Sequence, residues 1–149
     1  MKAKMYLYVL MLLLGVVLAV HLSMNSQVGL TLNNPQMGNA IFWCIGAVTA
    51  VIIGLTNWDP EVFARLKDVP VWLLTAGAIG AALVFGIAWI IPQIGAAPAF
   101  LLMIAGQVIA GMVMSHFGFL GAPVEPISIT KILGALMLIG GAGLVTFSK

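Results

Sequence analysis

Five hydrophobic blocks occupy almost the whole of this 149-residue chain. A helix that crosses a hydrocarbon core of about 30 Å needs about 20 apolar residues, and each block has roughly that length. The chain is 62% hydrophobic and 7% charged, whereas a soluble domain carries about 25% charged residues. The sequence therefore predicts a single membrane domain, residues 1–149. The predicted spans are Met5–Val28, Gly38–Thr56, Val69–Ile91, Ala96–Ser115 and Ile127–Phe147.

Helices, rather than the strands of a closed barrel, fit these blocks. Barrel strands are segments of about 10 residues in which apolar and polar side chains alternate, and the blocks are longer and do not alternate. The sequence thus predicts an all-α integral membrane fold. The first block also resembles a signal peptide, since Lys2 and Lys4 precede it, but Ala19–Ser23 lacks a small-x-small cleavage site. We expect this block to remain as a transmembrane helix.

Few polar side chains limit the partners and chemistries open to this chain. The net charge of +2 is scattered, so no basic patch follows a phosphate backbone and nucleic acid is not an expected partner. Cys44 is the only cysteine, which excludes an intrachain disulfide and a cysteine cluster for a metal. The sequence also has no nucleophile elbow, phosphate loop or metal-ligand spacing. We expect no enzyme activity, cofactor or metal, and the lipid bilayer is the first expected partner.

The positive charges favour one orientation in the membrane. Five spans place the two termini on opposite sides, and Lys and Arg prefer the cytoplasmic side. If the N-terminus is in the cytoplasm, Lys149 is the only basic residue on the outer side. The basic residues on the cytoplasmic side are then Lys2, Lys4, Arg65, Lys67 and Lys131. This distribution predicts a cytoplasmic N-terminus and an external C-terminus.

Capping signals mark two helix starts between the spans. Asp59 followed by Pro60 is typical of a helix start, so Pro60–Lys67 is either a short interfacial helix or a solvated loop. Ser128 is a candidate cap for the fifth span. Trp89 lies near a span end, where aromatic rings usually anchor a helix at the membrane interface.

Small residues recur at helical spacing on the last three spans. Helices in lipid associate through close backbone approach, often at glycine. Most of these glycines are therefore expected to serve helix packing. The predicted packing positions are Gly77, Gly80, Gly106, Gly111, Gly134 and Gly141.

Polar side chains at membrane depth are the candidates for function, because lipid does not solvate them. Gln107, near the middle of the fourth span, either lines a substrate pathway or hydrogen-bonds a neighbouring helix. His21 and Asn25 share one stripe of the first span with Gly29. An imidazole permits proton coupling, although His21 could equally be a neutral side chain bonded to a backbone carbonyl. Trp43 lies inside the second span, where it could line a cavity.

The second half of the chain contains a succession of short motifs. They are Pro70–Leu74, Ala76–Ala81, Ile91–Gly95, Ala105–Gln107, Ser115–Gly118 and Lys131–Gly134. In this order and spacing they resemble the five-helix YdcZ-like family of the drug/metabolite transporter (DMT) superfamily. Gly15 and Asn25 agree with the first span of that family. Ala76 and Ser115 depart from its pattern, which often has a glycine and an acidic residue there.

The resemblance implies half of a ten-helix inverted-repeat transporter in the bacterial inner membrane. Inverted repeats place a substrate site near the midplane, at their interface. A second copy in a homodimer of dual topology, or a sister five-helix chain, would complete such a site, although the charge bias favours a single orientation. Two functions stay open. One is a transporter subunit that moves a small metabolite or drug-like molecule by alternating access. The other is a non-transporting scaffold or regulatory subunit of a larger transporter.

Overall fold

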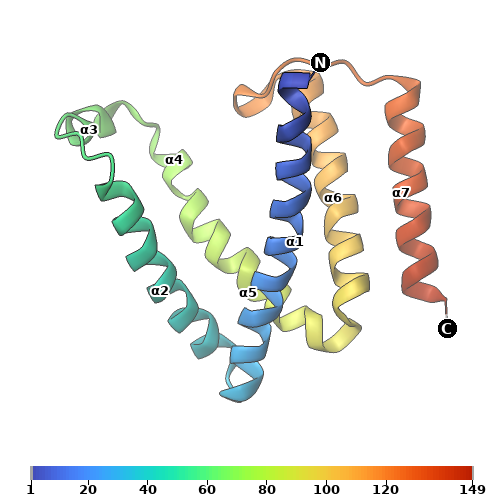
Figure 1. Ribbon diagram of the computed structural model, residues 1–149, viewed down its shortest axis with the longest axis horizontal. Coiled ribbons are helices and arrows are strands. Elements are labelled where there is room, and N and C mark those ends of the chain that lie inside the picture. Colours follow the sequence, from blue (N-terminus) through green and yellow to red (C-terminus); the bar gives the residue numbers. More distant parts are fainter. Residues whose placement is uncertain (1, 149) are drawn as a thin grey trace. The chain divides into compact units, whose positions relative to one another are not determined.

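The chain is built from helices that are long enough to cross a membrane. The computed structural model describes residues 2–148, and it describes side chains from residue 5 onward. Five segments have the length and hydropathy of membrane spans, and no β-strand occurs within residues 2–148. The five spans lie in α1 (Lys2–Thr31), α2 (Pro35–Leu55), α4 with α5 (Val71–Leu74 and Ala76–Ile94), α6 (Ala96–Phe117) and α7 (Ile129–Phe147) (Figure 1). The predicted all-α membrane fold with five transmembrane helices is confirmed.

The chain divides into two compact units, residues 1–93 and 94–149. The first unit contains α1, α2, the short helix α3 (Val62–Arg65), the 3₁₀ turn η1 (Leu66–Asp68), α4 and nearly all of α5. The second unit contains α6, the 3₁₀ turn η2 (Phe119–Gly121) and α7. The arrangement of all five helices as one domain, and as half of an inverted repeat, stays a prediction.

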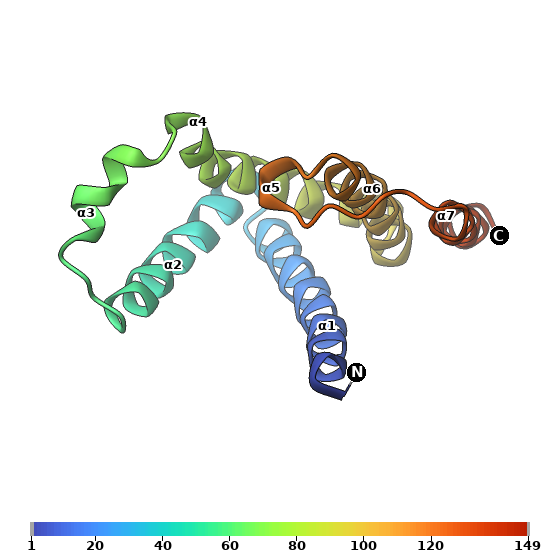
Figure 2. The ribbon, with the colours of Figure 1, turned by 90° about the horizontal axis from the view of Figure 1, so that it is seen from above.

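In the first unit, α1 and α2 meet at a tight turn and separate toward their other ends, as Figure 2 shows from above. Asn33 adopts a left-handed conformation with φ of 47° in this turn. Asn34 Oδ1 accepts a hydrogen bond from Met37 N at 3.0 Å and caps α2. Because Pro35 fits the first turn of a helix, α2 begins at Pro35, before the predicted start at Gly38.

Two glycines allow α1 and α2 to touch beside this turn. A Cβ on Gly38 would lie 2.8 Å from Gly29 Cα, and a Cβ on Gly29 would lie 3.1 Å from Pro35 Cα. Both glycines are buried. Since a side chain at Gly38 would collide with backbone, the helix crossing depends on glycine at this position.

The third span runs from Val71 to Ile94, whereas the predicted span was Val69–Ile91, and it is interrupted at Thr75. Thr75 separates α4 from α5, and its Oγ1 donates a hydrogen bond to Trp72 O at 2.6 Å. At the other end α5 continues through Pro92 to Ile94. Proline removes its own N–H and crowds the carbonyl of residue i−4, but α5 continues past it and ends before Gly95, whose φ is 89°.

The connection before α4 contains the one-turn helix α3 and the turn η1. Asp59 Oδ1 accepts a hydrogen bond from Glu61 N at 2.9 Å at the start of this segment. Arg65 forms ion pairs with Asp59 and with Glu61, the latter at 3.2 Å. Both expectations for Pro60–Lys67 are thus partly correct, because a short helix forms and its side chains are exposed.

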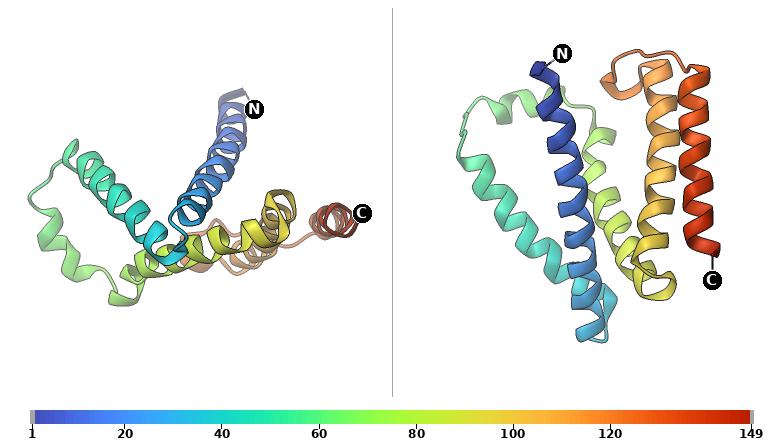
Figure 3. Two further views of the ribbon diagram at one scale, coloured as in Figure 1. Left: turned by 90° about the horizontal axis from the view of Figure 1, so that it is seen from below. Right: turned by 45° about the vertical axis from the view of Figure 1, so that its right-hand side comes forward.

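In the second unit, α6 and α7 lie side by side and run in opposite directions (Figure 3, right). Gly118, with φ of 67°, ends α6 after Phe117 rather than at the predicted Ser115. Ser128 Oγ accepts a hydrogen bond from Lys131 N at 3.2 Å. The predicted cap of the fifth span is therefore present.

Polar contacts hold the loop between α6 and α7. Glu125 N donates to Ser115 O at 2.9 Å, and the Glu125 carboxylate pairs with Lys131 Nζ at 3.0 Å. His116 Nδ1 accepts a hydrogen bond from Ile127 N at 3.2 Å. His116 thus fixes the loop backbone, which is a structural role.

Candidate functional site

A chain of hydrogen bonds joins three helices of the first unit. Asn25 Nδ2 on α1 donates to Asn39 Oδ1 on α2 at 3.2 Å. Asn39 Nδ2 in turn donates to the carbonyl oxygen of Ala81 on α5 at 3.4 Å. Asn25 is 1% exposed, so this polar relay lies inside the unit and ties α1, α2 and α5 together.

The Ala81 carbonyl determines which groups of the two asparagines donate and which accept. A carbonyl oxygen can only accept, so Asn39 must present its NH₂ group to Ala81. The Oδ1 atom of Asn39 then faces Asn25, which must donate with its own NH₂ group. Asn25 Oδ1 is consequently left over, and it is buried without a hydrogen-bond partner among the described residues.

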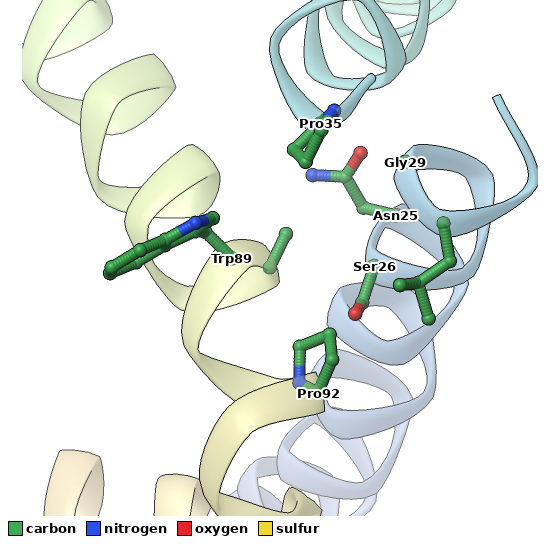
Figure 4. Close-up of a pocket in the computed structure, with 8 residues that line it drawn as sticks. Asn25, Ser26, Gly29, Pro35, Trp89 and Pro92 are labelled. Carbon is green, nitrogen blue, oxygen red and sulfur yellow. The ribbon is translucent and has the colours of Figure 1, made fainter. Parts of the chain in front are cut away.

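A small pocket of about 120 Å³ lies beside Asn25 (Figure 4). Residues of α1, of the start of α2 and of α5 form its wall. Figure 4 shows the Asn25 carboxamide projecting from α1 toward Pro35, with Trp89 and Pro92 on the opposing helix. The lining residues are Asn25, Ser26, Gly29, Leu30, Pro35, Ala88, Trp89 and Pro92.

A larger groove of about 660 Å³ follows the opening between α1 and α2. Its wall is mostly aliphatic, with Val17, Val20 and Met24 among the residues from α1. His21 and Trp43 also line it. The ring centroids of His21 and Phe42 lie 4.6 Å apart. The groove therefore has the size and apolar character of a site for a small organic molecule.

Two polar atoms in this groove have no hydrogen-bond partner. They are His21 Nδ1 and Trp43 Nε1, both buried, and neither meets a donor or acceptor in the described part of the chain. Trp43 Nε1 can only donate, whereas a neutral imidazole nitrogen either accepts or donates. An unpartnered polar atom costs free energy in an environment without water. Both atoms are covered, so a ligand in the groove would pair with them only after the surrounding side chains move.

The predicted pathway residues fall in both units. His21 and Trp43 line the groove and Asn25 lines the small pocket, all within the first unit. Gln107 lies on α6 in the second unit, and its side chain is exposed. A pocket of about 430 Å³ in that unit is lined by Val108 and Gly111 among others, but not by Gln107. The pathway role of the four residues stays a prediction.

Most glycines predicted to pack helices have open space around them. A Cβ on Gly80 would lie 3.8 Å from the Trp43 ring, an ordinary van der Waals contact. At the other five predicted positions an added Cβ would meet no described atom of a neighbouring helix within 4 Å. These positions are Gly77, Gly106, Gly111, Gly134 and Gly141. Their packing role therefore stays a prediction, and it would require contacts beyond those described in one chain.

At the α1–α2 crossing the sequence points to Asn25 and Gly29 of α1, but not to the residues of α2 that they meet. It indicates Gly38 only as the start of a span, and it does not single out Asn39. The sequence did contain a signal for this crossing. An Asn that follows a Gly inside an apolar helix places a polar side chain beside a position where another helix can approach closely. Ser26 and Pro92 were likewise not expected beside Asn25, since a pocket depends on which helix faces meet.

The five apolar helices define the chain as an integral membrane protein. Residues 6–144 match the model of the family described as "Putative inner membrane exporter, YdcZ". The chain belongs to this family, which confirms the resemblance drawn from its motifs. The description of this family is of a putative exporter in the inner membrane, that is, of a transporter rather than an enzyme. No curated protein and no solved structure matches the chain.

Proposed function

We propose that the chain is one subunit of an exporter that moves a small metabolite or drug-like molecule by alternating access. The groove between α1 and α2 supports this proposal most directly. It combines an apolar wall with two buried polar atoms that lack partners, His21 Nδ1 and Trp43 Nε1. In this proposal Trp43 donates a hydrogen bond to the substrate, and His21 accepts one or carries a proton.

A second subunit completes the transporter in this proposal. The groove is bounded by two helices that diverge, so another chain would supply its missing wall. Five spans also amount to half of a ten-helix inverted repeat. The partner is a second copy, inserted upside down in a homodimer of dual topology, or a sister five-helix chain. The open glycine positions on α6 and α7 then become contacts, since helices in lipid approach at small residues.

The charge distribution sets the expected orientation of a single copy. A cytoplasmic N-terminus keeps the positive residues of the α2–α4 connection, Arg65 and Lys67, on the cytoplasmic side. Labelling of both termini in native membranes tests this arrangement. A mixture of orientations supports an inverted homodimer. A single orientation points to a sister chain as the partner or to a parallel assembly.

Transport by the purified chain in liposomes tests the groove. A panel of small metabolites and drug-like molecules first identifies a substrate, and variants then locate its site. We expect His21→Ala and Trp43→Leu to reduce transport at least tenfold, because each removes a polar contact made inside the apolar groove. Trp72→Leu is the matched control, since Trp72 is an exposed tryptophan of the same unit. Unchanged transport in both groove variants would remove these assignments.

Gln107 requires a separate test, because it lies outside the groove. In a Cys44→Ala background, a cysteine replaces Val108 or Gln107 and is exposed to a water-soluble thiol reagent in sealed vesicles. Rapid reaction, together with lower transport by Gln107→Ala, supports a pathway along α6. Slow reaction with normal transport favours the alternative, in which Gln107 only hydrogen-bonds a neighbouring helix.

A further inference from the structure

Asn25, which lines this pocket, has a covered hydrogen-bond acceptor that no described group uses. Asn25 is 1% exposed, and its Oδ1 atom has no partner in the described structure. The relay through Asn39 to the Ala81 carbonyl explains why the oxygen of Asn25 is the unpaired atom, because the NH₂ group of Asn25 donates to Asn39. The pocket shares no lining residue with the His21 groove. It is therefore a second site on α1.

Other oxygen atoms lie around the same pocket. Ser26, 5% exposed, contributes a hydroxyl group. Ala88 and Pro92 both line the pocket from α5. A proline at position i has no N–H for the carbonyl at position i−4, so Pro92 cannot bond the carbonyl of Ala88. Oxygen atoms therefore belong to several residues around the pocket, and the Ser26 hydroxyl among them can both donate and accept.

The size and charge of the pocket limit what can enter it. About 120 Å³ is room for a group of about four non-hydrogen atoms, at about 30 Å³ for each water-sized unit. None of the residues that line it is charged. A cation would lose its hydration there without a counter-ion, which is costly at low dielectric. A neutral donor loses much less.

We propose that this pocket binds a compact, neutral hydrogen-bond donor, an amide N–H or a hydroxyl group. Asn25 Oδ1 accepts the hydrogen bond, and Asn39 is a positioning residue that holds the Asn25 carboxamide in the accepting orientation. The oxygen is covered in this structure, so the lining has to open for the ligand to enter. The statement that this donor is part of the exported molecule rests on the proposed function. The statement that the pocket binds a donor does not rest on it.

Ligand-observed NMR on the purified protein in nanodiscs tests the proposal with two probes. Acetamide carries N–H donors, whereas acetone has the same number of non-hydrogen atoms, keeps the carbonyl and has no donor. We expect acetamide to bind at least about fivefold more tightly in the pocket, the value of one net hydrogen bond. Asn25→Ala should abolish this preference. Gln27→Ala is the matched control, because Gln27 is an exposed carboxamide on the same helix, and it should preserve it.

Two further measurements keep the test decisive if Asn25→Ala does not fold. Leu30→Trp changes a surface residue of the pocket wall, 54% exposed, and should block acetamide without touching the relay. Asn39→Leu should remove the preference for the donor probe by releasing the Asn25 carboxamide. Equal binding of both probes, or a preference that survives in Leu30→Trp, overturns the proposal.

A third probe separates the neutral donor from a cation. Methylammonium has N–H donors and a positive charge, and we expect it to bind at least fivefold more weakly than acetamide. Tighter binding of methylammonium overturns the neutral class. If acetamide binds as expected while His21→Ala leaves transport unchanged, the groove assignment fails and the Asn25 site stands. The reverse pattern removes only the Asn25 site.

Discussion

The α1–α2 pair and the α6–α7 pair both contain glycine, yet they use it differently. At the first crossing Gly29 and Gly38 are buried, and a Cβ on Gly38 would lie 2.8 Å from backbone of α1. Along α6 and α7, a Cβ on Gly106 or Gly134 would meet no described neighbour within 4 Å. Glycine at helical spacing therefore does not by itself locate a helix contact. The contact depends on which faces meet.

The polar side chains of the two pairs differ in the same way. Asn25 and Asn39 form a buried hydrogen bond between α1 and α2. The second pair instead carries its polar contacts in the exposed loop, where Glu125 pairs with Lys131. The first crossing thus combines close backbone approach with polar specificity. In the second pair, a Cβ on Gly106 or Gly134 meets no described neighbour within 4 Å, so these glycines make no such close approach.

The largest expected effect comes from adding one methyl group at the first crossing. Gly38→Ala forces α1 and α2 apart, because the new Cβ meets the backbone of Gly29, and should cost about 1–3 kcal/mol of unfolding free energy. Gly134→Ala is the control. It should be neutral or stabilising by up to about 1 kcal/mol, the difference in helix propensity. Unfolding in mixed micelles measures both, and equal losses would contradict the contrast between the pairs.

A smaller effect is expected at the start of α7. Ser128→Ala removes the side-chain acceptor for Lys131 N and should destabilise the protein by about 1 kcal/mol. Ser128→Asn keeps a capping oxygen and should restore most of the loss. The same unfolding measurement applies. A loss of equal size in both variants would show that the cap is not the cause.

The polar relay should contribute less than the glycine crossing. Hydrogen bonds between helices in lipid average about 0.6 kcal/mol, so a double-mutant cycle on Asn25 and Asn39 should give a coupling energy near that value. Pairing Gln27→Ala with Asn39→Ala should give a coupling close to zero. If the two couplings are equal, the relay makes no specific contribution at the first crossing.

The smallest effect is expected at the exposed ion pair of the second unit. Glu125 and Lys131 are 65% and 38% exposed at their side chains, and pairs of this kind contribute about 0–1 kcal/mol. Glu125→Gln should therefore cost well under about 1 kcal/mol. The difference from the unsubstituted protein should shrink at high salt, because salt screens exposed charges. A loss that is large and independent of salt would show that the loop depends on something other than charge.

Local chemistry made much of the fold predictable. The length and hydropathy of the five blocks indicated the spans, and Ser128 marked the start of the last one correctly. The boundaries that moved did so for local reasons as well. Asn34 and Pro35 start α2 earlier, and Gly118 ends α6 later than expected. Such capping effects depend on a few neighbouring residues.

The candidate site was less predictable, because it depends on contacts between helices. His21, Asn25 and Trp43 stood out as polar or amphipathic groups in apolar blocks. Their division between a groove and a separate pocket could not be read from spacing along one helix. Asn39 was missed for the same reason, since its partner at Ala81 lies on another helix.

Hydrophobic length, turn residues and motif order are local properties, so they were enough to predict a helical membrane protein that resembles the YdcZ-like family. The tertiary structure decided which helix faces meet. It brought Gly29 against Gly38 and oriented Asn39 toward the Ala81 carbonyl, so that Asn25 keeps a free acceptor beside a pocket. Whether a polar group in a membrane is hydrogen-bonded or free depends on the groups that lie next to it, and these groups come from distant parts of the chain.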